Sequence, residues 1–431
     1  MTLKVSFDNY LAEFYNINWF CQLPYNYGGR FVQIYSVQNQ QTLRFNNCKT
    51  VLNIIRDNQA TPISRADIAK ETFMSPTSIT RITADLIDLG IVKQAETFSK
   101  GVGRRATQLR IVSDAVLSLG LFIDKDFLRM CVIDCMGKVL DKACLCLEDQ
   151  DYNPEEIIQL AKGMYDEMCT KGRFDSNKVK VLGIGCVGNV DNKSGYVFFA
   201  PQMGWEKIDL RYLAEETFKM PIYIDNDLKM ALIGTTFNSD EMKKSDVSIV
   251  TIGVGVGVSV MYNGKLVRGI SNAAGEVGHT IFKPNGRLCV CGRMGCLASY
   301  LTEVGMVEIC KSKGYRVKSF KDIVEAYNNG EDWAIKEIDA FTSNIATFLG
   351  NMIYTYNTKY LLVIGSIIEN YQFIYDLSFS KIKDSIHDNL YSDVIIKRIS
   401  NPYSAAMGAA YTAQSIYIEN MIKTYINSND V

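Results

Sequence analysis

The most informative stretch of the sequence reads Gly275-Glu276-Val277-Gly278-His279 and continues, after nine residues, with Cys289-Val290-Cys291-Gly292-Arg293-Met294-Gly295-Cys296. One imidazole and three thiols in so short a span have the spacing of a metal site. Three thiolates and one imidazole complete the tetrahedral shell of Zn²⁺, so no coordination position would remain for catalysis. We therefore predict a structural zinc site with His279, Cys289, Cys291 and Cys296 as ligands; loop cysteines that bind no metal are the alternative.

The segments on either side of this stretch have the pattern of mixed α/β structure. Apolar runs of strand length occur at 119–123 and 128–134, and helical patterns then alternate with further strands as far as Asp225. A second block of the same kind begins at Val247 and contains the buried type of strand at 360–365. Two α/β lobes of similar layout predict a cleft between them, and clefts bind ligands.

Residues 45–112 have a different pattern, that of a small helical domain. Apolar residues recur at helical spacing from Cys48 onward. Ser64 has the features of an N-cap, with Asp67 three residues later in a variant of the capping box. The pattern therefore predicts a first helix and a second one that begins after Ser64.

A third helix is predicted after Ser75, an N-cap residue that is followed by Pro76 at the first helical position. Gly90 ends this helix, and two short strands joined by a basic loop follow it. This order of elements predicts a winged helix-turn-helix, with the third helix in the major groove of DNA and the loop against phosphate or the minor groove. The predicted DNA-contacting residues are Ser75, Thr77, Ser78, Thr80, Arg81, Lys100, Arg104 and Arg105.

The local charge supports this interpretation. Residues 45–110 hold ten Lys or Arg and six Asp or Glu, whereas the whole chain of 431 residues has a formal net charge of −1. A small helical domain with a basic, solvated loop is the alternative.

The remaining composition is that of an ordinary globular protein, with 47% hydrophobic and 22% charged residues. No apolar run reaches the length of a membrane span and no signal peptide is evident, so we expect a cytoplasmic protein without a membrane partner. Residues 1–44 are rich in aromatic residues and have no regular period, so they form an N-terminal arm to which we assign no function.

The motif stretch resembles the signature of the ROK family, whose name stands for repressors, open reading frames and kinases. A winged helix ahead of such a body is similar to the repressor branch, which includes the xylose and N-acetylglucosamine repressors. The resemblance covers roughly residues 45–415. Further matches to the family are Gly183-Ile184-Gly185, Ala200-Pro201, Asn226-Asp227, Gly253 through Gly257, and Gly408-Ala409-Ala410.

The resemblance implies the fold class: an α/β protein with an N-terminal winged helix-turn-helix, followed by a two-lobed, actin-like (ribonuclease-H-like) ATPase-fold domain. The first lobe would span 115–235 and be completed by a C-terminal helix at 403–428; the second lobe, with the zinc motif, would span 236–402. The resemblance also implies a sugar in the cleft, with contacts from Asn226, Asp227, Glu276 and His279. In the family's kinases, the Asp of the Asn-Asp pair is the general base.

Departures from the family pattern argue against kinase activity. Where the kinases carry the Asp-x-Gly-x-Thr phosphate loop, this chain has Phe122-Ile123-Asp124-Lys125-Asp126. Two carboxylates would then face a polyphosphate and repel it. Gln202 and Ala298 replace two residues that contact the sugar in the family, which leaves the identity of the ligand open.

These observations predict a sugar-responsive DNA-binding transcriptional regulator, a repressor of carbohydrate uptake or catabolism genes, without kinase activity. Its partners would be a double-stranded DNA operator, a sugar or sugar phosphate effector, and further copies of itself in a homodimer or homotetramer. Two alternatives remain: an ATP-dependent sugar kinase with a DNA-binding head, and an interaction regulator that binds no ligand.

Overall fold

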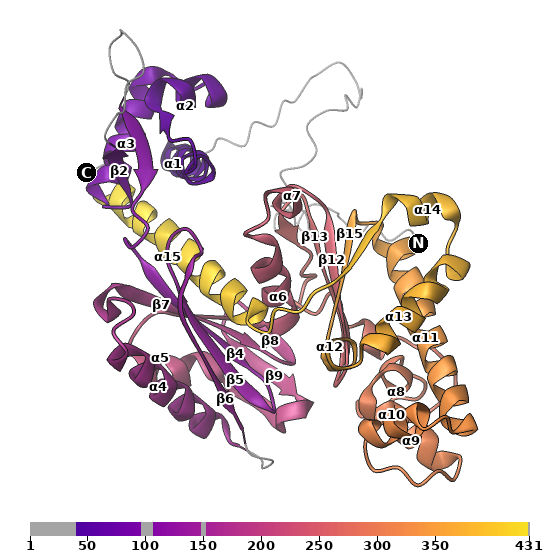
Figure 1. Cartoon of the computed structure of the whole chain (residues 1–431). Helices are drawn as coiled ribbons and strands as arrows, with labels where there is room; N and C mark the ends of the chain where they lie inside the picture. The colour runs from indigo at the N-terminus through magenta and orange to yellow at the C-terminus, as the bar shows by residue number, and fades with distance from the viewer. Residues whose placement is uncertain (1–39, 96–106, 148–151, 430–431) are drawn as a thin grey trace, which may run out of the picture.

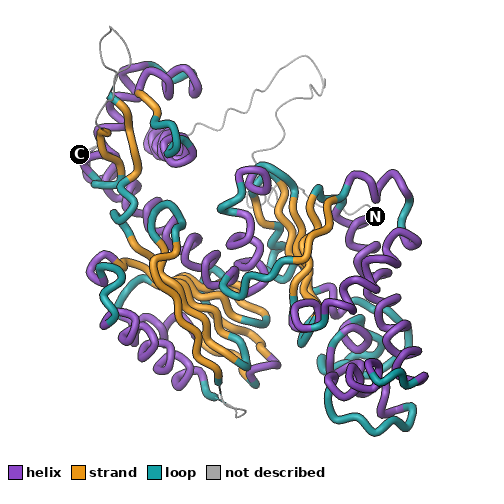
Figure 2. The backbone as a smooth tube through the Cα atoms, viewed as in Figure 1, coloured by secondary structure: helices purple, strands orange, loops and turns teal. Residues whose placement is uncertain are grey.

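The computed structural model describes residues 40–95, 107–147 and 152–429 of the chain. Three regions follow one another: a head (40–111), a first lobe (115–236) and a second lobe (240–402). Figure 1 shows the head at the upper left, the first lobe below it and the second lobe on the right. In Figure 2 the strands of the two lobes form two separate orange groups. The molecule is a mixed α/β protein, as predicted.

The head contains three helices and a three-stranded sheet with the order β1-β3-β2. The capping box of Ser64 with Asp67, and Ser75 as N-cap ahead of a proline, are present as predicted. The first helix begins at Gln40, earlier than expected, because its first turn is exposed and has no apolar period. The elements of the head are α1 (Gln40–Asp57), β1 (Ile63–Ser64), α2 (Arg65–Thr72), α3 (Pro76–Asp88), β2 (Val92–Ala95) and β3 (Gln108–Ile111).

The first lobe is a five-stranded sheet with the order β11-β7-β4-β5-β6, accompanied by a small sheet of β8, β9 and β10. Strand β4 is buried along its whole length, because helices cover both faces of the sheet. The elements are β4 (Leu117–Ile123), β5 (Phe127–Ile133), β6 (Val139–Cys146), α4 (Pro154–Thr170), η1 (Ser176–Lys178), β7 (Val179–Cys186), β8 (Asn189–Asp191), β9 (Tyr196–Ala200), η2 (Pro201–Met203), β10 (Trp205–Asp209), α5 (Leu210–Phe218), β11 (Ile222–Asn226) and α6 (Asp227–Thr236).

The second lobe has its own five-stranded sheet, with the order β14-β13-β12-β15-β16. Strand β12 contributes Val247 and Ile249 to the same apolar core as the first lobe, and Val250 and Ile252 to the core of the second lobe. The elements are α7 (Asp240–Lys243), β12 (Val247–Ile252), β13 (Val256–Tyr262), β14 (Lys265–Leu266), η3 (Val277–His279), α8 (Ala298–Leu301), α9 (Glu303–Ser312), α10 (Phe320–Asn328), α11 (Asp332–Tyr356), β15 (Tyr360–Ile364), α12 (Ser366–Asn370), α13 (Gln372–Ile382), η4 (Lys383–Ser385), α14 (Asp388–Asp393) and β16 (Ile395–Arg398).

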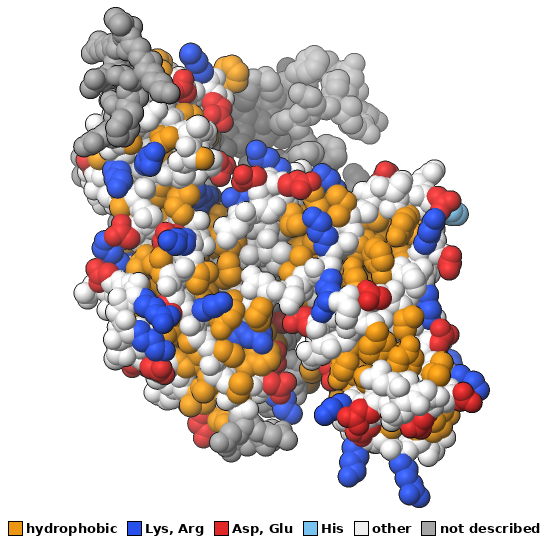
Figure 3. Space-filling view, in the orientation of Figure 1, with side chains coloured by type: hydrophobic (Ala, Val, Ile, Leu, Met, Phe, Trp, Pro, Cys, Tyr) orange, Lys and Arg blue, Asp and Glu red, His pale blue; other side chains and the backbone are white. Residues whose placement is uncertain are grey.

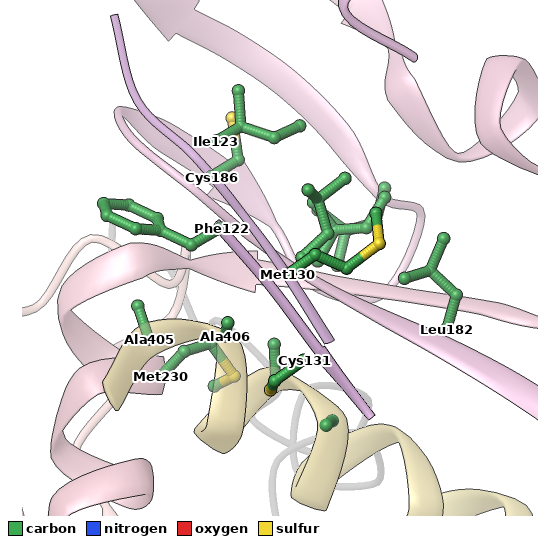
Figure 4. Packing of buried hydrophobic residues seen from close by; sticks show 14 of the residues in the cluster. Phe122, Ile123, Met130, Cys131, Leu182, Cys186, Met230, Ala405 and Ala406 are labelled. Carbon is green, nitrogen blue, oxygen red and sulfur yellow. The ribbon is translucent and has the colours of Figure 1, made fainter. Parts of the chain in front are cut away.

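The last helix, α15 (Ser404–Asn429), joins two of these regions. Its first half packs on the sheet of the first lobe, and Figure 4 shows Ala405 and Ala406 close to Met230 of α6 and Cys131 of β5. Its second half supplies Ile418, Ile422 and Ile426 to the core of the head. The sequence predicted only the first of these two contacts.

In the part of the chain that the structure describes, no helix combines the length and the apolar character needed to span a bilayer.

Candidate ligand cleft, metal cluster and DNA-facing helix

The ends of three parallel strands define the edge of the first lobe that carries the candidate ligand residues. Strands β4, β7 and β11 run parallel, and their register places Ile123 beside Cys186 and Cys186 beside Asn226. The residues that follow, Asp124 and Asp227, therefore leave the sheet at the same edge, two strand spacings or about 10 Å apart along the backbone. Their side chains can approach each other more closely across the intervening strand end.

Asn226 is held in place by its own hydrogen bonds. It is the N-cap of α6: its Oδ1 accepts from the backbone N–H groups of Leu228 and Lys229 at 3.1 and 3.2 Å. Its Nδ2 donates to the carbonyl oxygen of Gly188 at 3.1 Å and to Oδ1 of Asp227 at 2.9 Å. Asn226 thus orients Asp227, and both ends of its amide are already engaged.

The carboxyl group of Asp227 lies near two other acidic side chains at this edge. Burial, with the nearby charges of Asp124 and Glu276, raises the pKa of Asp227 to about 7. Burial also raises the pKa of Asp124, and the neighbouring Asp126 adds to this effect. The structure therefore brings the predicted residues Asp227 and Glu276 together. It adds Asp124, which the sequence analysis had considered only as a substitution in a phosphate loop.

The two glycines of the Gly275–His279 stretch are required by close backbone contact. Gly275 has φ 103°, and a Cβ there would lie 1.8 Å from the carbonyl oxygen of Val258. A Cβ on Gly278 would lie 2.3 Å from the carbonyl oxygen of Val256. The stretch thus lies directly against β13, which fixes Glu276 and His279 relative to the sheet of the second lobe.

His279, Cys289, Cys291 and Cys296 form a compact cluster, and their potential ligand atoms all lie within 4.8 Å of one another. The sulfur atoms of Cys291 and Cys296 are 3.6 Å apart, and the sulfur of Cys289 is 3.8 Å from Nδ1 of His279. Tetrahedral zinc with Zn–S bonds of about 2.3 Å requires sulfur atoms about 3.8 Å apart. The donor set and its spacing therefore fit zinc, and an ion bound through Nδ1 would leave Nε2 of the imidazole free.

The thiol of Cys291 lies in an environment that favours the thiolate. Its burial opposes ionisation, but hydrogen bonds from the backbone and side chain of Arg293, and from the neighbouring cysteines, lower the pKa of Cys291 to about 6.

A buried polar network connects the two lobes beside the cleft. Arg268 of the second lobe donates to Oδ2 of Asp225 at 2.5 Å, and Nδ2 of Asn272 donates to Oδ1 of the same carboxylate at 2.9 Å. Nζ of Lys229, a residue only 2% exposed, donates to the carbonyl oxygen of Asn272 at 2.9 Å. Burial lowers the pKa of Lys229. The network secures the loop that leads into Glu276, and the sequence analysis did not predict it.

The lobes also meet beside the glycine-rich turn that follows β12. A Cβ on Gly255 would lie 3.2 Å from Nε2 of Gln202, which belongs to the first lobe. The hydroxyl group of Ser366 donates a hydrogen bond to Glu303.

Helix α3 presents the polar face expected of a DNA-reading helix. Its buried side consists of Ile79, Ile82, Thr83 and Leu86. The predicted residues Ser75, Thr77, Ser78, Thr80 and Arg81 are all exposed. Lys100, Arg104 and Arg105, predicted for the wing, lie outside the described residues.

Phe73, in the turn between α2 and α3, was missed by the sequence analysis. It has φ 57°, a conformation that favours glycine, and its side chain is 95% exposed. The signal for this exposed residue was available in the sequence, because Phe73 is an aromatic residue in a turn that would suit glycine.

A family model described as "ROK family" matches residues 120–416. This chain belongs to the ROK family. A xylose repressor of Bacillus spizizenii is 24% identical over 355 residues, which cover 82% of this chain and 91% of that protein. The DNA-binding transcriptional dual regulator NagC of Escherichia coli is 24% identical over 320 residues, covering 72% of this chain and 78% of NagC.

Solved structures of the ROK family have the same fold. A ROK transcriptional regulator, described as a homologue of the E. coli Mlc protein, matches 89% of this chain and 99% of its own, with a TM-score of 0.73 and 20% identity. A ROK hexokinase from Thermus thermophilus matches 70% of this chain and all of its own, with a TM-score of 0.60 and 17% identity. The actin-like ATPase fold of the two lobes is thus shared by regulators and kinases, and the fold alone does not distinguish the two activities.

Proposed function

We propose that this chain is a sugar-responsive transcriptional repressor without kinase activity. The observation that carries the proposal is α15, which contributes to the core of the first lobe and to the core of the head. A change at the ligand cleft can therefore reach a helix whose exposed face is suited to DNA. The ROK relatives named as repressors support the same conclusion.

In the head, α3 would enter the major groove, with Ser75, Thr77, Ser78, Thr80 and Arg81 as the residues that face the bases and nearby phosphates. Lys100, Arg104 and Arg105 would contact the phosphate backbone. On the face of the two lobes that Figure 3 shows, basic and acidic side chains are interspersed.

In the cleft, Asp227 and Glu276 would accept hydrogen bonds from sugar hydroxyls, and His279 would contact the sugar through the nitrogen that does not bind metal. Asn226 would act mainly by orienting Asp227, because both ends of its amide are engaged. Binding between the lobes would change their closure and, through α15, the position of the head.

Phosphoryl transfer is not part of the proposal, because Asp124 and Asp126 stand in the segment where the family's kinases carry their phosphate loop, so two carboxylates would face a nucleotide's phosphates. Like charges about 4 Å apart repel by about 1 kcal/mol in water and by several times more where water is excluded. The hydroxyl group of Ser366 is likewise engaged, by Glu303.

Zinc at His279, Cys289, Cys291 and Cys296 would be structural, holding the loop that carries His279 against the cleft. Elemental analysis of the purified protein should find about one zinc per chain. Cys289→Ser should lose the metal and lower the thermal stability, and a protein isolated without zinc would contradict this assignment.

A gel-shift titration with palindromic DNA tests the main proposal. We expect binding at low salt, with release by one member of a panel of sugars, because effector and operator affinities are coupled reciprocally. Absence of any DNA affinity would exclude the repressor. A coupled assay for ADP release over the same sugars separates the kinase alternative, and calorimetric titrations that stay flat for every sugar would favour the interaction regulator.

The repressor would act as a homodimer or larger assembly in the cytoplasm, so that two α3 helices reach successive major grooves about 34–36 Å apart. Sedimentation of the protein with and without DNA tests this part.

A further inference from the structure

A second cavity lies in the second lobe, between the turn at 283–287 in the metal loop and helices α9 and α11. Its volume is about 470 Å³, within the range of sites for small organic ligands. None of its lining residues belongs to the predicted sugar site. Figure 1 shows the helices that line it, α8, α9 and α11, on the right of the molecule, far from the head.

Positive charge predominates among the ionisable groups that line this cavity: Lys283, Arg287 and Lys313 against the single carboxylate of Glu337. Nζ of Lys313 lies 2.6 Å from Oε1 of Glu337, and Glu337 is only 7% exposed, so these two charges neutralise each other. Within the part of the chain that the structure describes, Lys283 and Arg287 have no ion-pair partner. Nη1 of Arg287 donates to the hydroxyl oxygen of Ser312 at 3.2 Å, a neutral group, so the charges of Lys283 and Arg287 are both left for an anion.

The rest of the lining is suited to an organic group rather than to a bare ion. The half-buried side chains of Tyr300 and Ile309 supply apolar surface, with the buried Met306 and Phe341 beneath them. The half-buried amide of Asn344 faces the same cavity and has no hydrogen-bond partner among the described residues. A ligand that filled the cavity would thus meet cations at one part, apolar surface at another, and an unused hydrogen-bonding amide.

We propose that this cavity binds a small organic phosphate monoester. The guanidinium of Arg287 and the ammonium of Lys283 would hold the phosphate, because guanidinium N–H groups match two phosphate oxygens and lysine adds a second charge. The organic part would lie against Tyr300 and Ile309, with a polar group at Asn344. The inference does not rest on the proposed repressor function, because no residue of the cleft or head takes part.

The turn that carries the two cations is anchored to the metal loop. The backbone N–H of Gly295 donates to the carbonyl oxygen of Arg287 at 2.7 Å, and the N–H of Lys283 donates to the carbonyl oxygen of Gly295 at 3.1 Å. A Cβ on Gly295 would lie 2.0 Å from the carbonyl oxygen of Lys283, so the two segments are in direct backbone contact. Loosening the metal cluster would therefore displace both cations.

Isothermal titration calorimetry of the full chain tests the proposal, with glucose 6-phosphate and adenosine monophosphate as the two kinds of monoester, and inorganic phosphate and glucose as reference ligands. We expect at least one monoester to bind at least about tenfold more tightly than inorganic phosphate, and glucose not to compete with it. The two monoesters distinguish a sugar phosphate from a nucleotide as the source of the group. Binding of neither monoester would overturn the proposal.

Variants locate the binding. Lys283→Ala and Arg287→Ala should each weaken monoester binding about tenfold, the loss expected for one charge-assisted contact. Lys311→Ala is the matched control, since Lys311 lies on α9 and pairs with Glu308 outside the cavity lining. Lys313 is left unchanged, because its removal would leave Glu337 buried without a partner.

Glu276→Gln separates this cavity from the interlobe cleft, and monoester binding should be the same in this variant as in the unaltered chain. Loss of monoester binding in Glu276→Gln, or unchanged binding in both Lys283→Ala and Arg287→Ala, would overturn the proposal.

Discussion

The two halves of α15 make contacts of opposite kinds. In the first half, small residues bring backbones together: a Cβ on Gly183 would lie 2.0 Å from the carbonyl oxygen of Ala409, and one on Gly120 would lie 2.0 Å from that of Ala406. In the second half, branched side chains such as Ile422 fill the core of the head. Backbone contacts have no room to adjust, whereas side chains can repack at moderate cost. The first lobe therefore fixes the position of α15, and the head follows.

The predicted sugar site is connected to the first half of α15 through α6. This helix begins at Asp227, and a Cβ on its Gly234 would lie 1.9 Å from the carbonyl oxygen of Ser404. A Cβ on Gly408 would lie 1.9 Å from the carbonyl oxygen of Met230. We therefore expect α6 and α15 to move together when a ligand changes the cleft.

The largest expected effect comes from adding a methyl group where the first half of α15 packs on the sheet of the first lobe. Gly183→Ala should destabilise the first lobe by more than about 3 kcal/mol, because the new Cβ would overlap the carbonyl oxygen of Ala409. Urea denaturation measures the loss. Gly163→Ala on α4 is the control: no atom lies within 4 Å of the new Cβ, and alanine favours the helix by up to about 1 kcal/mol. Equal stabilities of the two variants would contradict the backbone contact.

A cavity made in the second half of α15 should lower the stability less than Gly183→Ala does, and it should affect the head. Ile422 is 1% exposed, and the substitution Ile422→Ala should lower the free energy of unfolding by about 2–5 kcal/mol. DNA affinity should fall while the affinity for the sugar effector remains. Ile335→Ala, at a position 43% exposed on α11, should change stability by less than about 0.5 kcal/mol. An Ile422→Ala variant that loses effector binding and keeps DNA binding would contradict the assignment of the second half of α15 to the head.

The carboxyl group of Asp227, at the start of α6, should make the stability of the protein depend on pH. Burial raises the pKa of Asp227 to about 7 from an ordinary value of 3.8, so the folded protein retains a proton that the unfolded chain releases. This contribution to stability is complete below about pH 4 and is lost as the pH rises through about 7.

Asp227→Asn should therefore be less sensitive to pH than the unaltered chain between these values, as measured by thermal unfolding at a series of pH values. Asp166→Asn, on the exposed side of α4, serves as control and should keep the original profile. Identical profiles for Asp227→Asn and the unaltered chain would show that this carboxyl does not titrate in the way stated.

The smallest expected effect concerns a surface contact of the second half. Nζ of Lys49 lies 2.5 Å from Oε1 of Glu419, and both side chains are partly exposed. A double-mutant cycle with alanine at both positions should give a coupling of less than about 1 kcal/mol, reduced further in high salt. A coupling above about 2 kcal/mol would mean that a surface ion pair, rather than the isoleucines, holds the head to α15.

Local signals in the sequence predicted much of the fold. Ser64 and Ser75 were identified as N-caps because their side chains act on backbone groups two or three residues away. The apolar runs predicted the central strands, and the spacing of His279 and the three cysteines predicted a cluster that the structure does bring together. Whether the cluster holds zinc stays a prediction.

Features that depend on strand order or distant contacts could not be predicted. Asp124 and Asp227 leave the sheet at the same edge only because β4 and β11 both run parallel to β7, and no local pattern reports that order. Arg268 and Asn272 lie in a loop without periodicity, so nothing indicated that they would pair with Asp225. The family resemblance predicted that a C-terminal helix completes the first lobe, but nothing in the sequence indicated that Ile418, Ile422 and Ile426 pack in the head.

The dependence of the head on α15 has a consequence for biosynthesis. The helices of the head are translated early, yet Ile418, Ile422 and Ile426 emerge from the ribosome only after both lobes have been made. An incomplete nascent chain therefore exposes the apolar surface of its head and cannot yet present a finished reading helix. Occupation of an operator would be restricted to chains whose sensor has already been synthesised.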